Sequence, residues 1–193
     1  MANADTPFGL KPVAHRNGAC YNGAFRVYNI ASGDGTATFI GDPVKLAGTA
    51  STVNGVIYSD VIQGTAAATV VGVVVGFAPN PSDLSSRHRA ASTQRLVYVA
   101  DDPDLLFEIQ EVSGGTALTA NDIGLNANFV VAAGSTTTAL SGVELNNATE
   151  ATTNTLDLHI VGLVPREDNA IGEHAKWLVS LNNHQYANQV AGV

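Results

Sequence analysis

Acidic side chains gather most densely at Asp101, Asp102 and Asp104, in the string Asp-Asp-Pro-Asp. Carboxylate oxygens at this spacing are the ligands that Ca²⁺ prefers. A twelve-residue calcium loop also needs a glycine at its sixth place and a glutamate at its twelfth place, and this string is followed by neither. Because aspartate and proline are common turn residues, we interpret the string as a solvated turn.

Three histidines lie in the last third of the chain, at His159, His174 and His184, and Glu173 precedes one of them. Zinc needs three or four convergent ligands, and a close pair of histidines on one helix is the usual signal. These histidines lack that spacing, so the sequence predicts neither a metal site nor a bound cofactor. We expect His159, which alternates with apolar residues, to point outward from a strand.

A nucleophilic enzyme needs a serine or cysteine beside a positioned base, and the Gly-x-Ser-x-Gly pattern is absent. Cys20 is the only cysteine, and His15 precedes it by five residues, which does not establish a catalytic pair. The string from Gly33 to Gly35 lacks the Gly-Lys-Ser/Thr of a phosphate loop, so we interpret it as a turn. The sequence predicts no catalytic residues and a protein that is not an enzyme.

Arg87-His88-Arg89 is the only tight basic cluster, and Arg95 follows it closely. Short charge runs are most often solvated, so an exposed loop is one interpretation. The other is a docking contact with an acidic patch on a neighbouring molecule.

Composition narrows the classes of protein further. The 193 residues suffice for one domain with a real core. Charged residues make up only 13% and the net charge is −8, with no lysine or arginine between Leu96 and Pro165. Because phosphate backbones require clustered cations, nucleic acid is excluded as a partner.

The apolar segments are too short for a membrane span of about 20 residues, the longest being 69–79. The N-terminus lacks the basic-then-apolar order of a signal peptide. Together with the single cysteine, this predicts a protein made in a reducing cytoplasm that has no membrane partner.

Hydrophobic periodicity predicts an all-β protein. The Val-rich segment 69–77 is apolar almost throughout, which indicates a strand covered on both faces. Segments 96–100 and 105–111 flank the Asp-Pro turn and are expected to pair as a hairpin. Trp177 alternates with Val179 and Leu181, which predicts a core position. Further strands are expected at 25–30, 44–46, 53–58, 129–132, 156–164 and 176–181.

Many short strands separated by polar turns favour a single β-sandwich or β-barrel, jelly-roll-like or tulip-like, over residues 25–193. Residues 1–24 are predicted to form an extended N-terminal docking arm, because prolines and glycines block a helix while apolar residues need a surface to cover them. We expect the following residues to contact a partner: Phe8, Leu10, Lys11, Val13, Arg16, Arg87 and Arg89.

Two strings within the first 45 residues, Thr6-Pro-Phe-Gly-Leu-Lys-Pro12 and Gly41-Asp-Pro-Val44, resemble the start of small head proteins of tailed bacteriophages. The stretches 160–169 and 177–185 resemble the same proteins more loosely, and the middle third matches only in general character. The resemblance implies a decoration, or cement, protein that binds and stabilises the major capsid lattice. It also implies the outer capsid surface as the location, after synthesis in the host bacterium.

The resemblance further implies two partners, the major capsid protein and further copies of this chain in a homotrimer or homodimer. Several weak arms on one oligomer would hold cooperatively to a repeating lattice. Two other functions remain open. One is a different virion role, such as a head-fibre base, a tail component or the shell protein. The other is a carbohydrate-binding or adhesin-type β-sandwich, although aromatic residues make up only 6%.

Overall fold

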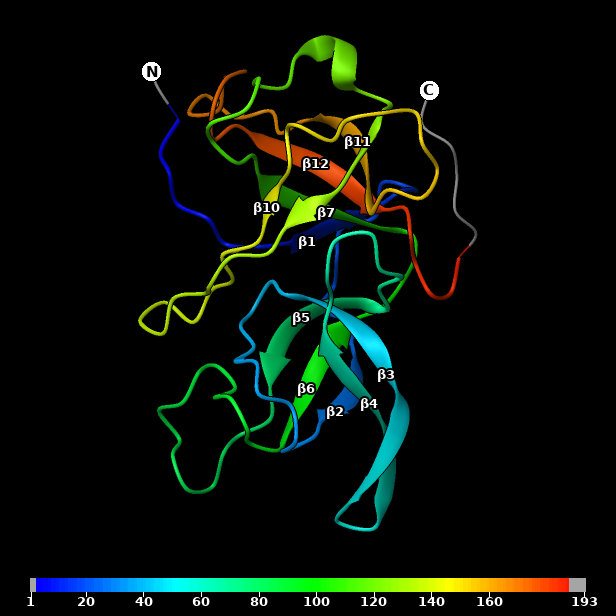
Figure 1. The fold of residues 1–193 in the computed structure, drawn as a ribbon, viewed down its shortest axis with the longest axis vertical. Coiled ribbons are helices and arrows are strands. Elements are labelled where there is room, and N and C mark those ends of the chain that lie inside the picture. Colours follow the sequence, from blue (N-terminus) through cyan, green and yellow to red (C-terminus); the bar gives the residue numbers. More distant parts are fainter. Residues whose placement is uncertain (1–2, 188–193) are drawn as a thin grey trace.

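The computed structural model describes residues 3–187 and is all-β. Strands form a closed five-stranded barrel and a five-stranded sheet that lie one above the other (Figure 1). Within the described range, the only helical element is the single 3-10 turn η1 (Ala120–Asp122). The predicted fold class is therefore confirmed at the level of an all-β protein.

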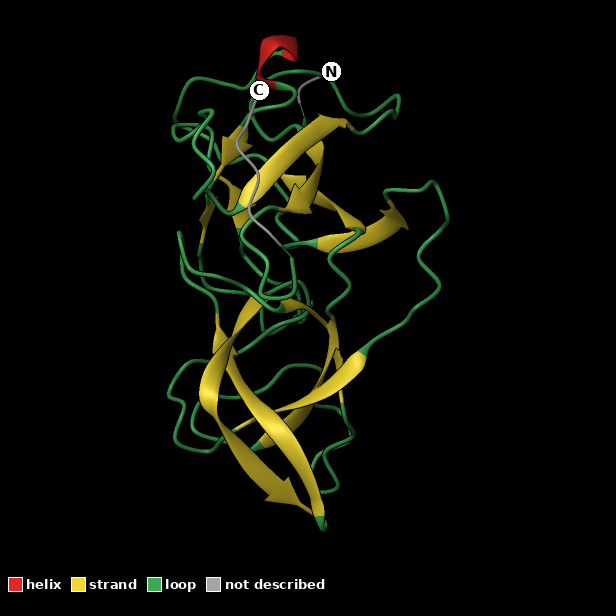
Figure 2. Ribbon diagram, turned by 90° about the vertical axis from the view of Figure 1, so that its right-hand side faces the viewer, coloured by secondary structure: helices red, strands yellow, loops and turns green. Residues whose placement is uncertain are grey.

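The barrel has the strand order β2-β4-β3-β5-β6, and β6 closes it by pairing with β2. Its strands coil around a common axis in the lower half of Figure 2. The hairpin of β3 and β4 is longer than the rest of the barrel and extends beyond it, turning at Asn54 and Gly55, which both have positive φ. The barrel strands are β2 (Arg26–Ile30), β3 (Pro43–Val53), β4 (Val56–Gln63), β5 (Gly72–Phe77) and β6 (Arg95–Ala100).

The sheet has the order β1-β7-β12-β11-β8, and all of its pairings are antiparallel. A separate two-stranded ribbon of β9 and β10 lies beside it. The strands outside the barrel are β1 (Lys11–His15), β7 (Leu105–Gln110), β8 (Asn126–Ala127), β9 (Phe129–Val130), β10 (Glu144–Leu145), β11 (Leu158–Leu163) and β12 (Lys176–Leu181).

The Val-rich segment lies between two hydrophobic cores. Val71 and Val74 belong to the barrel core, whereas Val70 and Val73 belong to the core beneath the sheet. All four side chains are fully buried. This explains why the segment is apolar on both faces and confirms the prediction that it is covered on both sides.

Trp177 is also fully buried, as predicted, and its indole Nε1–H donates to Glu111 Oε2 at 2.8 Å. Glu111 is a buried carboxylate that accepts two further bonds, from the Leu118 backbone N–H and from Asn147. Three donors therefore replace the water that this carboxylate loses on folding.

Two sequence predictions of the fold are wrong. The segment 53–58, predicted as one strand, contains the turn at Asn54 and Gly55 that joins β3 to β4. Strands β6 and β7 do not form a hairpin, because β6 pairs with β2 and β5 whereas β7 pairs with β1 and β12. The Asp-Pro turn between them instead carries the chain from the barrel to the sheet. Part of the predicted docking arm 1–24 packs on the chain's own sheet: β1 is an edge strand, and Leu10 lies in the core beneath the sheet.

Candidate docking cleft between the barrel and the sheet

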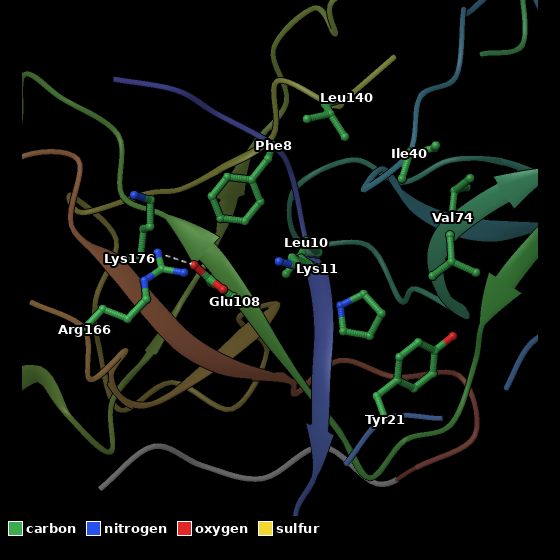
Figure 3. Close-up of a pocket in the computed structure, with 12 residues that line it drawn as sticks. Phe8, Leu10, Lys11, Tyr21, Ile40, Val74, Glu108, Leu140, Arg166 and Lys176 are labelled. Atoms are coloured by element: carbon green, nitrogen blue, oxygen red, sulfur yellow. Dashed lines mark ion pairs between the residues drawn. The ribbon is translucent and has the colours of Figure 1, made fainter. Parts of the chain in front are cut away.

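A cleft of about 530 Å³ opens where the barrel meets the sheet. The N-terminal strand passes through it, with charged side chains of the sheet on one side and apolar side chains on the other (Figure 3). Its lining includes Phe8, Lys11, Ile40, Val74 and Leu140. Open, mostly apolar hollows with a few charged groups are the usual form of binding sites.

Two backbone segments cross closely at Gly9 and Gly41, next in sequence to the cleft-lining residues Phe8 and Ile40. The Leu10 N–H donates to the Gly41 carbonyl at 2.9 Å, and the Gly41 N–H donates to the Val74 carbonyl at 2.8 Å. Both glycines have positive φ, and a Cβ on Gly9 would lie 2.5 Å from the Gly41 oxygen. Only glycine fits at these positions.

The side chain of Asp42 holds the segment around Gly41 in place. Its buried carboxylate accepts from the Phe39 backbone N–H at 2.8 Å and from the Ser141 hydroxyl at 2.5 Å. Burial raises the pKa of Asp42, and these two hydrogen bonds lower it in part. The strings 6–12 and 41–44, far apart in the sequence, thus form one structural unit next to the cleft.

The charged wall of the cleft is mainly cationic. Arg166 forms an ion pair with Glu108 at 2.7 Å and a second, longer pair with Asp168 at 3.4 Å. Lys11 and Lys176 also line the cleft, and neither forms an ion pair with any described residue. The wall is therefore positive on a chain of net charge −8, which favours a ligand that combines apolar groups with a carboxylate.

Three of the predicted docking residues meet at this cleft, but not in equivalent positions. Phe8 is half-buried and Lys11 is exposed, so both are accessible to a partner. Leu10 is only 1% exposed and packs within the core, so the expectation that it contacts a partner is wrong in this structure. Burial on the chain's own sheet has already removed its apolar surface from water.

Val13 and Arg16 lie further along the same segment and do not line the cleft. Val13 is half-buried in β1, and its carbonyl accepts from the Tyr21 N–H at 3.2 Å. Arg16 is exposed overall, but its guanidinium donates to the Ser180 hydroxyl at 3.0 Å.

The basic cluster divides into one exposed and one buried arginine. Arg87 is exposed in the 78–94 loop, away from the cleft lining. Arg89 is completely buried; it donates to the backbone carbonyls of Thr36, Ala31, Asp34 and Thr93, and pairs with the Asp34 carboxylate at 3.4 Å. The docking role expected for Arg89 is therefore wrong, because its donors hold the barrel loops together.

The acidic turn does not form a convergent carboxylate site. The Asp101 carboxylate accepts from the Tyr28 hydroxyl at 2.8 Å and pairs with Arg26 at 3.4 Å. Asp102 pairs with His15 at 3.3 Å. These aspartates bind different partners, which agrees with their interpretation as a turn.

Cys20 and His15 project from opposite faces of their segment. Cys20 is exposed and forms an isolated antiparallel β-bridge with Ala14. His15 follows Ala14, and side chains of adjacent residues in an extended segment point in opposite directions. His15 therefore points away from the thiol, toward Asp102.

The histidines of the last third have three different environments. His159 is half-buried rather than fully outward, and its Nδ1 lies 2.8 Å from the Asn126 side-chain oxygen. His184 is buried. Burial lowers the pKa of His159 and that of His184. His174 lies beside Asp5 and Glu144, a grouping that linear spacing did not indicate.

Sequence reasoning missed Arg166, Lys176 and Ile40 at the cleft. Arg166 follows β11 and Lys176 begins β12, so pairing of these two strands brings both to the same end of the sheet. Strand β7 lies between β12 and β1, and its Glu108 pairs in register with Lys11. No local signal marks the three missed residues, because the relevant proximity arises only from strand order.

Comparison with known proteins gives no match to any family model, curated protein or solved structure. Among the described residues, no helix has the length and apolar character needed to cross a membrane.

Proposed function

We propose that this chain is a structural protein of a tailed-phage head, a decoration or cement protein that binds the major capsid lattice and stabilises it. The observation that carries the proposal is the place of two segments in the fold: Phe8, Leu10, Lys11 and Pro12 of the first segment line the cleft, and the second follows the lining residue Ile40. The strings 6–12 and 41–44, on which the resemblance to phage head proteins rests, are the two segments that cross at Gly9 and Gly41.

The chemistry of the cleft defines the kind of capsid segment that it would bind. Phe8, Ile40 and Leu140 offer apolar contacts, and Lys11 and Lys176 are free of ion pairs to described residues. A capsid segment with an apolar side chain next to an aspartate or glutamate satisfies both features. Each partly exposed apolar side chain that becomes covered contributes on the order of 1–3 kcal/mol.

Self-association is the second part of the proposal. Val56 and Ile57 occupy the tip of the β3–β4 hairpin and are 50% and 73% exposed. Exposed apolar side chains on a projecting hairpin are suited to contact between copies or with the lattice. A trimer or dimer would present several clefts to a repeating surface and so bind with avidity.

Binding to undecorated capsids tests the proposal. Co-sedimentation is measured with the native protein, with Lys11→Glu/Lys176→Glu, and with the control Lys45→Glu, which reverses a charge on barrel strand β3 outside the cleft lining. We expect the double variant to melt like the native protein but to bind at least about ten-fold more weakly, because two favourable charge contacts become repulsive.

The control variant should bind like the native protein. Equal binding by all three proteins would contradict docking through the cleft. Failure of the native protein to bind any undecorated capsid of its phage would contradict the decoration function itself.

A further inference from the structure

Three side chains with metal-ligating atoms converge outside the cleft. Asp5 comes from the N-terminal segment, Glu144 from β10 and His174 from the loop before β12. Their ligand atoms all lie within 4.8 Å of one another. The Asp5 side chain is 63% exposed and that of His174 is 17% exposed, so an ion can reach the cluster from solvent.

The side-chain amide of Gln110 lies within hydrogen-bonding distance of all three side chains of this cluster. The Gln110 amide nitrogen lies 3.0 Å from Asp5 Oδ1, 2.9 Å from Glu144 Oε1 and 3.4 Å from His174 Nδ1. An amide NH₂ has two hydrogens, so it satisfies two acceptors and leaves the third atom free. It also carries no net charge with which to balance two carboxylates.

The local charge is correspondingly unfavourable without an ion. Burial raises the pKa of Glu144, and the charge of Asp5 raises it further, while Gln110 and His174 lower it. Within residues 3–187, neither carboxylate forms an ion pair with a lysine or arginine. A divalent cation would supply the missing positive charge.

The distances suit a small transition-metal ion. Zinc binds imidazole nitrogen and carboxylate oxygen at about 2.0–2.2 Å, which separates neighbouring ligands of a tetrahedron by about 3.4 Å. Asp5 Oδ1 and His174 Nδ1 lie 3.5 Å apart. One imidazole and two carboxylates leave the fourth position for water or for the Gln110 amide oxygen after rotation of the amide.

We propose that Asp5, Glu144 and His174 form a binding site for a divalent transition-metal ion, with zinc as the best fit, that clasps the N-terminal segment onto the sheet. The same segment already contacts the loop before β12. Asn3 donates to the carbonyls of Ala170 and Glu173 at 2.8 and 2.9 Å, and the Thr6 N–H donates to Gln110 Oε1 at 3.0 Å. A bound ion would add coordinate bonds that link the N-terminal segment to β10 and to the loop before β12.

This proposal opposes the sequence expectation that the chain holds no metal. That expectation rested on spacing along the chain, whereas the three ligands lie 139 and 30 positions apart and meet only through the fold. A second explanation of the cluster is that a protonated His174 balances Asp5 without any metal. A chelator distinguishes the two explanations: it should destabilise the protein if a metal is bound and have no effect if protonated His174 balances Asp5.

The test uses full-length protein freed of metal with a chelator and then titrated with Zn²⁺ by calorimetry at about pH 7.5. We expect one Zn²⁺ per chain and a higher melting temperature, because a ligand that binds only the folded state stabilises it. Co²⁺ in its place should give the intense visible absorption of a tetrahedral site. Side chains that only hydrogen-bond to one another, without binding a metal, would not produce this absorption.

His174→Ala and Asp5→Asn should each weaken Zn²⁺ binding by more than the ~10–100-fold that loss of an outer-shell partner costs. The matched control is His15→Ala, which removes a histidine from the isolated pair with Asp102 and should leave Zn²⁺ binding unchanged. Absence of stoichiometric Zn²⁺ binding, or binding that survives both ligand variants, would overturn the proposal. Stabilisation that appears only on acidification, equally with and without chelator, would assign the cluster to protonated His174 and overturn it as well.

Discussion

Replacement of Leu10 by alanine separates the packing of the N-terminal segment within the chain from its proposed docking on a partner. Leu10 is 1% exposed and contacts the core beneath the sheet, whereas Phe8, two residues earlier, is half-buried at the cleft. The backbone around Leu10 is held by the glycine crossing with Gly41, so it has little freedom to close a cavity. We therefore expect Leu10→Ala to act mainly on folding.

The expected loss follows from the size of the cavity. Leucine-to-alanine changes in a rigid core cost about 2–5 kcal/mol of unfolding free energy. For a chain of this length, each kcal/mol lowers the melting temperature by about 2–4 °C, so Leu10→Ala should melt about 4–20 °C below the native protein. Phe8→Ala removes a side chain that is still partly in water and should cost less than half as much.

Thermal melts followed by circular dichroism measure both variants, and co-sedimentation with capsids measures their binding. The account predicts that Leu10→Ala loses stability and Phe8→Ala loses binding. If both variants melt within about 2 °C of the native protein, the segment is not part of the core and the description of its packing is wrong.

Three further predictions concern buried polar groups. Burial raises the pKa of Asp157 to about 6, above the unfolded value near 3.9, so its contribution to stability falls as pH rises from about 4 to 6. Between pH 4 and 7, Asp157→Asn should therefore gain up to about 3 kcal/mol of unfolding free energy relative to the native protein, measured by urea unfolding. A difference between the two proteins that does not change with pH would contradict this. Arg89→Lys should lose about 2–4 kcal/mol in the same assay, since an ammonium cannot reach all the carbonyls that the guanidinium holds; native-like stability would refute that role. Trp177→Phe should lose about 2–4 kcal/mol in unfolding followed by circular dichroism, because Glu111 loses a buried donor, and an unchanged midpoint would show that this bond is dispensable.

The sequence was most informative where a local pattern decides the structure. Alternation and β-branched residues located β2, β6, β7, β11 and β12, because side-chain period is a local property. The long hairpin of β3 and β4 was predicted only in short pieces. The apolar run around Val71 and Val73 revealed a strand covered on both faces. Its cause, a position between two cores, appears only in the fold.

Pairing between distant segments could not be predicted from such patterns. The Asp-Pro turn after Ala100 looks like a hairpin turn, yet it links the barrel to the sheet. Leu10 looked like a residue awaiting a partner because the edge position next to β7 was not evident from local sequence. The cationic wall of the cleft and the cluster at His174 depend on strand order in the same way.

The composition of purified virions tests the central claim most directly. Under the proposed function, a tailed phage encodes this chain; its virions are separated on a gel, and the copy number of the chain is measured relative to the major capsid protein. The account predicts a copy number near that of the capsid protein, with the chain lost from the shell when Lys11→Glu/Lys176→Glu replaces the native sequence. A handful of copies would indicate a portal, tail or fibre role, and absence from the virion would contradict the proposed function.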